Sequence, residues 1–168
     1  IERDGTADEI FVEFDVINIP SVQWRLVSAD TSIGYVQIFR FTSRTPEELR
    51  IALEELKDRD IEGIVVDLRN NYGGLLQEAV EVAGMFLGNG VVLYEVTRAD
   101  EEIYRVDDND AIMDLPLVIL VNEGTASASE LVAGAIQDRQ RGVLIGQRTY
   151  GKGTIQQIFQ LSDQSSVH

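Results

Sequence analysis

Cysteine is absent from this chain of 168 residues, and histidine occurs once, as the terminal residue His168. The absence of cysteine excludes disulfide bonds, thiolate metal sites and cysteine nucleophiles. A catalytic triad of serine, histidine and aspartate is nearly excluded, because the only histidine stands at the very end of the sequence. A serine nucleophile in this chain would therefore need a different general base.

Basic residues are scarce as well. There are 14 lysine and arginine residues against 29 aspartate and glutamate residues, which gives a formal net charge of -15. We do not expect a nucleic-acid partner, because binding to a phosphate backbone requires a basic face. No apolar run approaches the roughly 18 residues of a membrane-spanning helix. Hydrophobic residues make up 44% of the chain, which suits one domain with a sizeable core.

Two familiar motifs are present only in part. The acidic stretch Asp107–Asp110 lacks the glycine and the distal glutamate of an EF-hand loop, so we predict a solvated turn there. Gly146 to Lys152 spells the start of a P-loop, but Gly153 follows where a serine or threonine should bind magnesium. The segment also leads into a β-rich run rather than a helix, so nucleotide binding is not predicted.

The remaining sequence alternates between strand and helix patterns. We predict strands at residues 10–17, 22–27, 33–39, 63–68, 91–97, 103–106, 117–121, 142–146 and 154–161, the second and third pairing as a hairpin, and helices starting at 45, 75 and 127. The first helix should have Thr45 as its N-cap, Pro46 at N1 and Glu48 at N3. Such alternation indicates βαβ units and a layered α/β domain.

The segment Leu117–Glu130 is the centre of the chain. The apolar run Leu117–Val121 predicts a strand buried on both faces, and a turn of small residues then leads into a helix near Ser127. A helix start at this place would present the Ser127 hydroxyl beside unpaired backbone N–H groups. Ser127 and Glu130 also form the pattern of a capping box, in which the serine only caps its helix. The residues alone allow both interpretations.

Two glycine-containing loops could complete a site around Ser127. Gly73 and Gly74 follow the strand at 63–68, and consecutive βα turns should meet at one edge of a parallel sheet. Their unshielded N–H groups suit an oxyanion hole, although the glycines could serve only a tight turn. Lys152 stands between two glycines, and a lysine buried there could act as a general base for Ser127. The alternative is a solvated surface lysine.

Three blocks, read together, resemble the signatures of the carboxy-terminal processing (tail-specific) serine peptidases. They are DLRNNYGGLL at 67–76, VNEGTASASE at 121–130 and GQRTYGKGTIQ at 146–156. Their order agrees with that family, as does the spacing from Ser127 to Lys152. The resemblance covers about residues 18–168.

The resemblance assigns a role to each of five residues. It implies that Ser127 is the nucleophile, that Lys152 is the general base, and that Gln156 orients the lysine amine. The oxyanion hole would consist of the N–H groups of Gly73 and Ala128. A rival serine at 129 lies two residues further along the helix and would point about 200° away from the first.

The resemblance also carries expectations about the whole protein. It implies an α/β core similar to the crotonase and Clp-protease fold, and a serine endopeptidase that cleaves proteins near their C-termini without a cofactor or metal. Protein or peptide C-termini would be its partners, and a homo-oligomer and peripheral membrane association of the full-length protein are compatible with it. The expected location is periplasmic, secreted or membrane-associated outside the cytoplasm, including the thylakoid lumen.

The chain departs from the family pattern in two ways. Tyr72 stands where the family usually has proline, and this change would loosen the glycine loop. Residues 1–17 resemble only the closing strands of a PDZ domain, and the chain stops where the family continues into further β structure. We therefore expect a truncated peptidase core at 18–168, and an inactive isolated fragment is compatible with this expectation.

Two functions from other classes remain open on the residues alone. One is a peptide-binding or ligand-binding module without chemistry on the same fold. The other is an acyl-CoA enzyme of the crotonase type, which also uses paired backbone N–H donors but gives no role to Lys152 and Gln156.

Overall fold

A five-stranded sheet forms the centre of the molecule. The computed structural model describes residues 2–3, 6–7, 19–28, 32–98, 100–107, 112, 114–154 and 159–167. The sheet has the order β3-β4-β5-β8-β9 and consists of β3 (Val22–Leu26), β4 (Ile33–Ile38), β5 (Gly63–Asp67), β8 (Leu117–Val121) and β9 (Val143–Gly146). The last four strands are parallel, and β3 is antiparallel to β4, which confirms the predicted hairpin.

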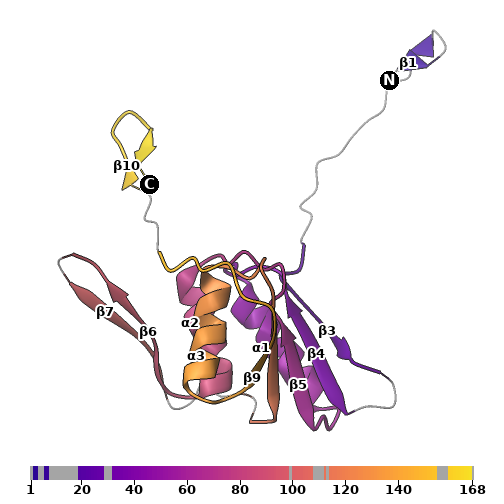
Figure 1. Cartoon of the computed structure of the whole chain (residues 1–168). Helices are drawn as coiled ribbons and strands as arrows, with labels where there is room; N and C mark the ends of the chain where they lie inside the picture. Colours follow the sequence, from indigo (N-terminus) through magenta and orange to yellow (C-terminus); the bar gives the residue numbers. More distant parts are fainter. Residues whose placement is uncertain are drawn as a thin grey trace.

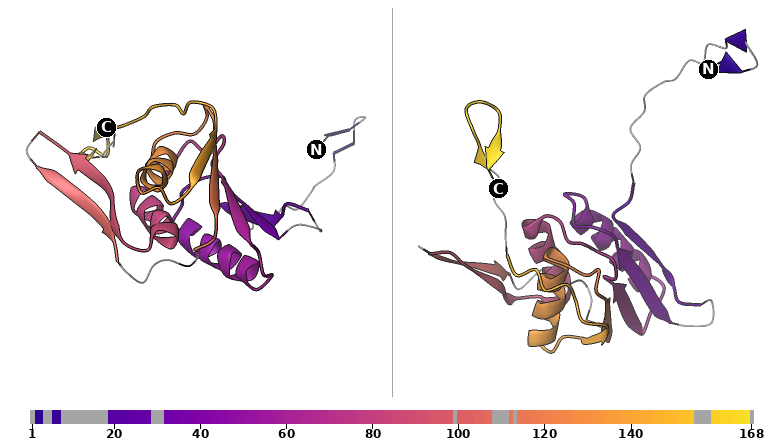
Figure 2. Two further views of the ribbon diagram at one scale, coloured as in Figure 1. Left: turned by 60° about the horizontal axis from the view of Figure 1, so that its bottom comes forward. Right: turned by 45° about the horizontal axis from the view of Figure 1, so that its top comes forward.

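Three helices cover one face of this sheet (Figure 1, Figure 2). They are α1 (Thr45–Lys57), α2 (Leu76–Leu87) and α3 (Ala128–Asp138). Leu53 of α1, Val82 of α2 and Val132 of α3 have no exposed surface, and they share one core with Val36 and Ile119 of the sheet. The predicted α/β layered architecture is confirmed, because each parallel strand after β4 is reached through a helical crossover.

Burial along β8 differs from the expectation. The sequence predicted a strand buried on both faces, but only Leu117, Ile119 and Val121 are buried, and the two residues between them are half-buried. The three helices occupy one side of the sheet, so the alternate side chains lack a covering layer among the described residues. On the neighbouring edge strand, Val143 and Ile145 are exposed.

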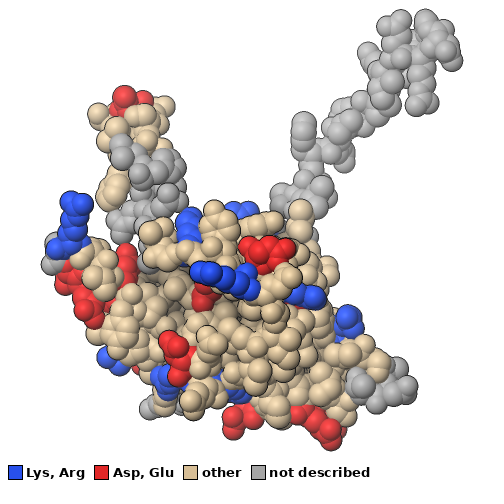
Figure 3. Space-filling view, in the orientation of Figure 1, with Lys and Arg blue, Asp and Glu red and all other residues tan. Residues whose placement is uncertain are grey.

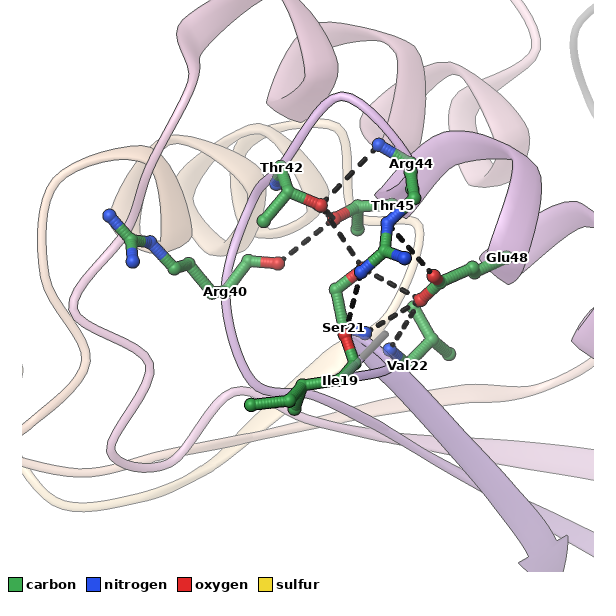
Figure 4. A network of polar contacts seen from close by, with 8 residues as sticks. All are labelled: Ile19, Ser21, Val22, Arg40, Thr42, Arg44, Thr45 and Glu48. Atoms are coloured by element: carbon green, nitrogen blue, oxygen red, sulfur yellow. Dashed lines mark hydrogen bonds and ion pairs between the residues drawn. The ribbon is translucent and has the colours of Figure 1, made fainter. Parts of the chain in front are cut away.

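The start of α1 also differs from the expectation. Thr45 does not cap the helix, because its hydroxyl accepts a hydrogen bond from the Thr42 N–H at 2.8 Å and donates one to the Arg40 carbonyl at 2.9 Å. Glu48 does not fold back onto the helix either. Its carboxylate accepts hydrogen bonds from the N–H and the hydroxyl of Ser21, at 2.6 and 2.7 Å (Figure 4). The two side chains therefore join α1 to the segments on either side of the β3–β4 hairpin.

A second, two-stranded sheet projects beyond the helices (Figure 1). It pairs β6 (Gly90–Val96) with β7 (Glu101–Val106), close to the predicted strands. Leu93 and Val106 pack against Val80 of α2 and form a small second hydrophobic cluster. This contact fixes the base of the hairpin next to the N-terminal half of α3, where the candidate site lies.

Two short hairpins stand near the ends of the chain. One pairs β1 (Glu2–Arg3) with β2 (Thr6–Ala7), and the other pairs β10 (Phe159–Gln160) with β11 (Ser166–Val167). The predicted strand at 10–17 lies outside the described residues, so the PDZ assignment stays a prediction. The predicted strand at 154–161 is confirmed only at 159–160, because residues 155–158 are outside the described part. Among the described helices, none has the length and hydropathy of a membrane span.

Candidate active site

The three loops singled out in the sequence meet at one edge of the sheet. Strands β5, β8 and β9 end there together, since Asp67 pairs with Leu120 and Val121 pairs with Gly146 in the parallel register. Each strand then leads into one of the loops, at 69–75, 122–127 and 147–154. The carboxyl ends of parallel strands are where α/β folds usually carry their sites.

Ser127 has a backbone conformation that a simple helix cap does not need. Its φ is 56° and its ψ is −121°, whereas an N-cap residue usually has extended angles. A non-glycine residue in such a region stores about 1–3 kcal/mol of strain, and this strain is typical of a nucleophile on a sharp strand-to-helix turn. The capping box that the sequence allowed is present, because the Ser127 side chain faces the Glu130 N–H and the Glu130 carboxylate accepts a hydrogen bond from the Ser127 N–H at 2.8 Å. The hydroxyl makes no close cap hydrogen bond, and the Glu130 N–H donates to the Ser127 carbonyl oxygen at 2.8 Å.

Asn71 helps to hold the Ser127 turn in this conformation. Its carbonyl oxygen accepts hydrogen bonds from the Ala126 N–H at 3.0 Å and from the Ser129 hydroxyl at 2.9 Å. The side chains of Asn71 and Ser129 are fully buried. Ser129, the rival serine, is thus occupied in a buried hydrogen bond, whereas Ser127 is half-buried and lines an open hollow.

Glu130 joins the serine turn to the lysine loop. Its carboxylate accepts hydrogen bonds from the N–H groups of Ser127, Gly151 and Lys152, at 2.8, 2.6 and 2.9 Å, and from the Thr149 hydroxyl at 2.7 Å. Burial alone would raise the pKa of Glu130, but these four hydrogen bonds outweigh it and hold the pKa below its ordinary value. One ionised side chain therefore sets the position of both predicted catalytic segments.

Ser127 and Lys152 line the same two hollows. One, of about 290 Å³, lies between them and residues 93–97 of the β6 edge, and the other, of similar volume, includes Gly74 and Ala128. Lys152 is exposed, so the described residues do not provide the burial that its proposed role as a neutral base requires. The pairing of these two residues as a dyad stays a prediction.

The glycine loop touches the serine turn, as predicted for neighbouring βα turns. Gly73 has a φ of 97°, and a Cβ added to it would lie 2.9 Å from the Ser127 Cβ and 3.0 Å from the Ala128 nitrogen. The Gly73 N–H, however, donates to the Asn71 side-chain oxygen at 2.9 Å. The Gly73 N–H must leave this bond before it can serve an oxyanion. Ala128 occupies the first turn of α3, where backbone N–H groups lack a helical acceptor.

An ion pair anchors the start of the glycine loop. Asp67 is almost completely buried and accepts hydrogen bonds from Arg69 at 2.6–3.1 Å and from the Tyr35 hydroxyl at 2.6 Å. Burial alone would raise the pKa of Asp67, but these partners hold it below its ordinary value. The pKa of Tyr35 is raised, first by burial and then by Asp67. The pair fixes the loop at its exit from β5.

Sequence reasoning did not identify two of these positions. Glu130 was considered only as a capping partner, and nothing nearby in sequence indicates its contacts with Thr149 and Gly151. Asn71 stands two residues before Gly73, the spacing of an Asx turn, so this contact could have been predicted. Gln156 lies outside the described residues, and its predicted role stays a prediction.

Comparison with known proteins identifies the family to which this chain belongs. The sequence profile of peptidase family S41 matches residues 32–168. The chain belongs to peptidase family S41. A carboxyl-terminal-processing protease of Synechocystis sp. is 43% identical over 136 residues, which cover 81% of this chain and 32% of that protein. The chloroplastic C-terminal processing peptidase of Tetradesmus obliquus is 44% identical over 141 residues, covering 83% of this chain and 30% of that protein.

A solved structure supports membership of the S41 family. The photosystem II D1 C-terminal processing protease superposes with a TM-score of 0.78 at 36% sequence identity, covering 89% of this chain and 42% of that one. The chain thus spans about a third of the length of its curated S41 relatives. Membership of the family confirms the resemblance that the three sequence blocks indicated.

Proposed function

We propose that this S41 chain is the core of a serine endopeptidase that cleaves proteins near their C-termini with a dyad of Ser127 and Lys152. The strained conformation of Ser127 supports this proposal most strongly. A serine that only capped its helix would gain nothing from such strain, whereas a nucleophile needs its hydroxyl to stand clear of the helix. The hollow that Ser127 shares with Lys152 provides room for a peptide carbonyl beside both side chains.

The proposed reaction has two stages. The Ser127 oxygen attacks the scissile carbonyl carbon, and the neutral Lys152 amine accepts the hydroxyl proton. The lysine then gives this proton to the leaving amine, and the C–N bond breaks to leave an acyl-serine. A water molecule, deprotonated by the same amine, attacks the ester carbon. The bond from this carbon to the Ser127 oxygen then breaks, the lysine returns the proton to that oxygen, and the second peptide product is released.

Backbone donors would stabilise the negative oxygen in both stages. The Ala128 N–H belongs to the helix start next to the nucleophile, and such a donor contributes about 3 kcal/mol in other enzymes. In our proposal the Gly73 N–H becomes the second donor when substrate displaces it from the Asn71 oxygen. Gln156 would orient the lysine amine.

The names of the relatives suggest the substrates and the location of this protein. Proteins of this group are named for processing carboxyl termini, and those of Tetradesmus obliquus and Arabidopsis thaliana are described as chloroplastic. We propose protein C-termini as substrates and a location outside the cytoplasm, with residues 1–17 belonging to a PDZ domain that captures them. Bound peptide would lie extended, as an added strand.

Removal of either dyad residue tests the proposal. In the full-length protein, Ser127→Ala and Lys152→Ala should each reduce peptide cleavage to background while the unfolding transition stays close to that of the wild type. The matched control is Ser129→Ala, which removes a buried hydrogen bond but no reacting atom and should retain cleavage by the molecules that remain folded. Sustained cleavage by purified Ser127→Ala protein, with contaminating proteases excluded, would refute the dyad.

A peptide-binding module without chemistry is the second candidate. The exposed Lys152 and the occupied Gly73 N–H favour it, because neither residue is in the state that catalysis requires. Incubation of the full-length protein with a fluorescent peptide distinguishes the two functions. Binding without any cleaved product over many hours indicates the module, whereas accumulation of two product peptides indicates the enzyme.

A further inference from the structure

Arg40 lies beside the glycine loop, and its side chain has no partner among the described residues. It follows β4, and its carbonyl oxygen accepts a hydrogen bond from the Thr45 hydroxyl at 2.9 Å, which holds its backbone. Its guanidinium has no hydrogen bond or ion pair within the part of the chain that the structure describes. Figure 4 shows the side chain pointing away from the network around Ser21 and Glu48.

Two arginines near Arg40 are engaged in contacts within the chain. Arg44 donates to the Ile19 carbonyl at 2.7 Å and approaches Glu48 at 3.6 Å. Arg69 holds Asp67, as described above. The chain has 29 acidic residues against 14 basic ones, so an arginine can readily find a carboxylate. Because the Arg40 guanidinium has no partner among the described residues, it is available to a ligand with a negative charge.

The residues around Arg40 line a surface hollow. Phe39, Arg40, Tyr72, Gly73 and Gly74 line a space of about 220 Å³, which we call the Arg40 hollow. Its two aromatic rings are 41% and 75% exposed and can still take up contact surface. Its walls are fixed to one another, because the loop after β4 pairs with the glycine loop through hydrogen bonds of 3.1 and 3.0 Å.

The Arg40 hollow adjoins the candidate active site. Gly74 lines both this hollow and the one that contains Ser127, Ala128 and Lys152, so the glycine loop is the wall between them. A peptide lying extended across that loop advances by about 3.3 Å per residue and would place one of its side chains in each hollow. The Arg40 hollow is therefore within reach of a substrate whose scissile bond lies at Ser127.

The electrostatic setting favours the same ligand. This edge of the sheet carries Arg40 after β4, Arg69 after β5, and Arg148 and Lys152 after β9. Figure 3 shows lysine and arginine side chains at this end of the molecule, interspersed with acidic ones. Arg69 is neutralised by Asp67. The positive charge there is therefore supplied by Arg40, Arg148 and Lys152. On a protein of net charge -15, these side chains attract an anionic segment locally while the acidic remainder of the surface repels it.

We propose that the Arg40 hollow is a substrate subsite that selects a residue carrying a carboxylate. The guanidinium pairs with the carboxylate, and the aromatic rings of Phe39 and Tyr72 pack against the carbon atoms of the same residue. The carboxylate is either the side chain of aspartate or glutamate, or the terminal carboxylate of the substrate. This subsite rests on the proposed function for its position in a substrate, but its binding preference can be measured without cleavage.

Paired peptides test the subsite in the full-length protein. In the first set of peptides, glutamate replaces glutamine at one position at a time on both sides of the cleaved bond. In a second set, the peptide ends at each of these positions with either a free or an amidated C-terminus. At one position the wild type should prefer the carboxylate by about fivefold to tenfold in kcat/KM at low salt. Arg40→Gln should abolish this ratio and Arg40→Glu should invert it. The free and amidated peptides identify which carboxylate is bound.

Two controls separate the subsite from the catalytic proposal. Arg50→Glu makes the same change of charge on the exposed side of α1, outside the hollow, and should leave the glutamate-to-glutamine ratio unchanged. The same peptides are also titrated against Ser127→Ala protein and its double variant with Arg40→Gln. If nothing is cleaved but the binding preference depends on Arg40, the subsite stands and the proposed enzyme fails. If the ratio in cleavage and in binding is the same with and without Arg40, the subsite is refuted.

Discussion

The first turns of α1 and α3 have the same sequence pattern but different backbone conformations. Thr45 to Glu48 and Ser127 to Glu130 both read as a hydroxyl residue followed three positions later by glutamate. At α1 the residue before the helix has ordinary helical angles, φ −96° and ψ −15°. At α3 it is Ser127, with φ 56° and ψ −121°. The same pattern thus starts a relaxed helix at one place and a strained one at the other.

The contacts of Glu48 and Glu130 show how the two helix starts differ in their role. Glu48 binds the backbone at the start of β3 and lies near Arg44, so it fastens a helix to a strand (Figure 4). Glu130 binds the backbone of Ser127 and of the loop that carries Lys152. Both are glutamates tied into networks of backbone N–H donors, but only Glu130 connects two segments with predicted chemical roles. The same kind of contact, a glutamate that accepts hydrogen bonds from backbone N–H groups, therefore stabilises the fold at α1 and positions the candidate catalytic loops at α3.

Replacing Glu48 or Glu130 should distinguish a role in stability from a role in catalysis. Glu130→Ala should lower kcat/KM by about 100-fold, because the serine and the lysine loops lose their common anchor and shift relative to each other. Glu48→Ala should leave the turnover of folded molecules within about twofold of the wild type. It should instead lower the free energy of unfolding by about 1–3 kcal/mol, because several backbone donors lose a charged acceptor. Peptide cleavage and urea unfolding measure the two quantities, and equal activity losses in both variants would remove the distinction.

Acidification should weaken both anchors together. Burial alone would raise the pKa of each glutamate, but hydrogen bonds hold both below the ordinary value of 4.5. A carboxyl with a lowered pKa in the folded state contributes stability above about pH 4.5, and this contribution is lost as the pH falls through the folded pKa. The free energy of unfolding should therefore decline below pH 4.5, and less steeply in Glu48→Gln and Glu130→Gln. Slopes that match the wild type in both variants would contradict these assignments.

Glycine substitutions should have the smallest effects, and effects of opposite sign. Ser127→Gly removes the Cβ that makes a φ of 56° costly, so the variant should be more stable by up to about 1 kcal/mol, although inactive. Thr45→Gly should be less stable by about 1–2 kcal/mol, because the hydroxyl loses its bonds to Thr42 and Arg40. Thermal unfolding compares the two with the wild type. Destabilisation by Ser127→Gly would show that the strain at α3 is not relieved by removing the side chain.

The comparison also shows how far the sequence predicts this molecule. The hairpin of β3 and β4, the starts of the three helices and the meeting of the βα turns all follow from local sequence patterns and from the handedness of crossovers. The same reasoning identified Ser127 and the glycine loop that touches it. These features depend on neighbouring residues and on general rules of topology.

The features that escaped prediction depend on partners distant in sequence. Thr45 and Glu48 did not form a capping box because Arg40 and Ser21 provided better partners. The angles of Ser127 are held by Glu130 and by Asn71, through the next loop along the sheet edge. A local pattern states which hydrogen bonds are available, but the tertiary structure decides which of them form.

Labelling of the serine hydroxyl tests the central claim most directly. A fluorophosphonate reacts with an activated serine and not with one that only caps a helix. Mass spectrometry of the labelled full-length protein should find the modification on Ser127, and Lys152→Ala should slow the reaction by at least about 100-fold. An unlabelled Ser127 in protein that is folded and binds peptide, or labelling of equal rate without Lys152, would contradict the account.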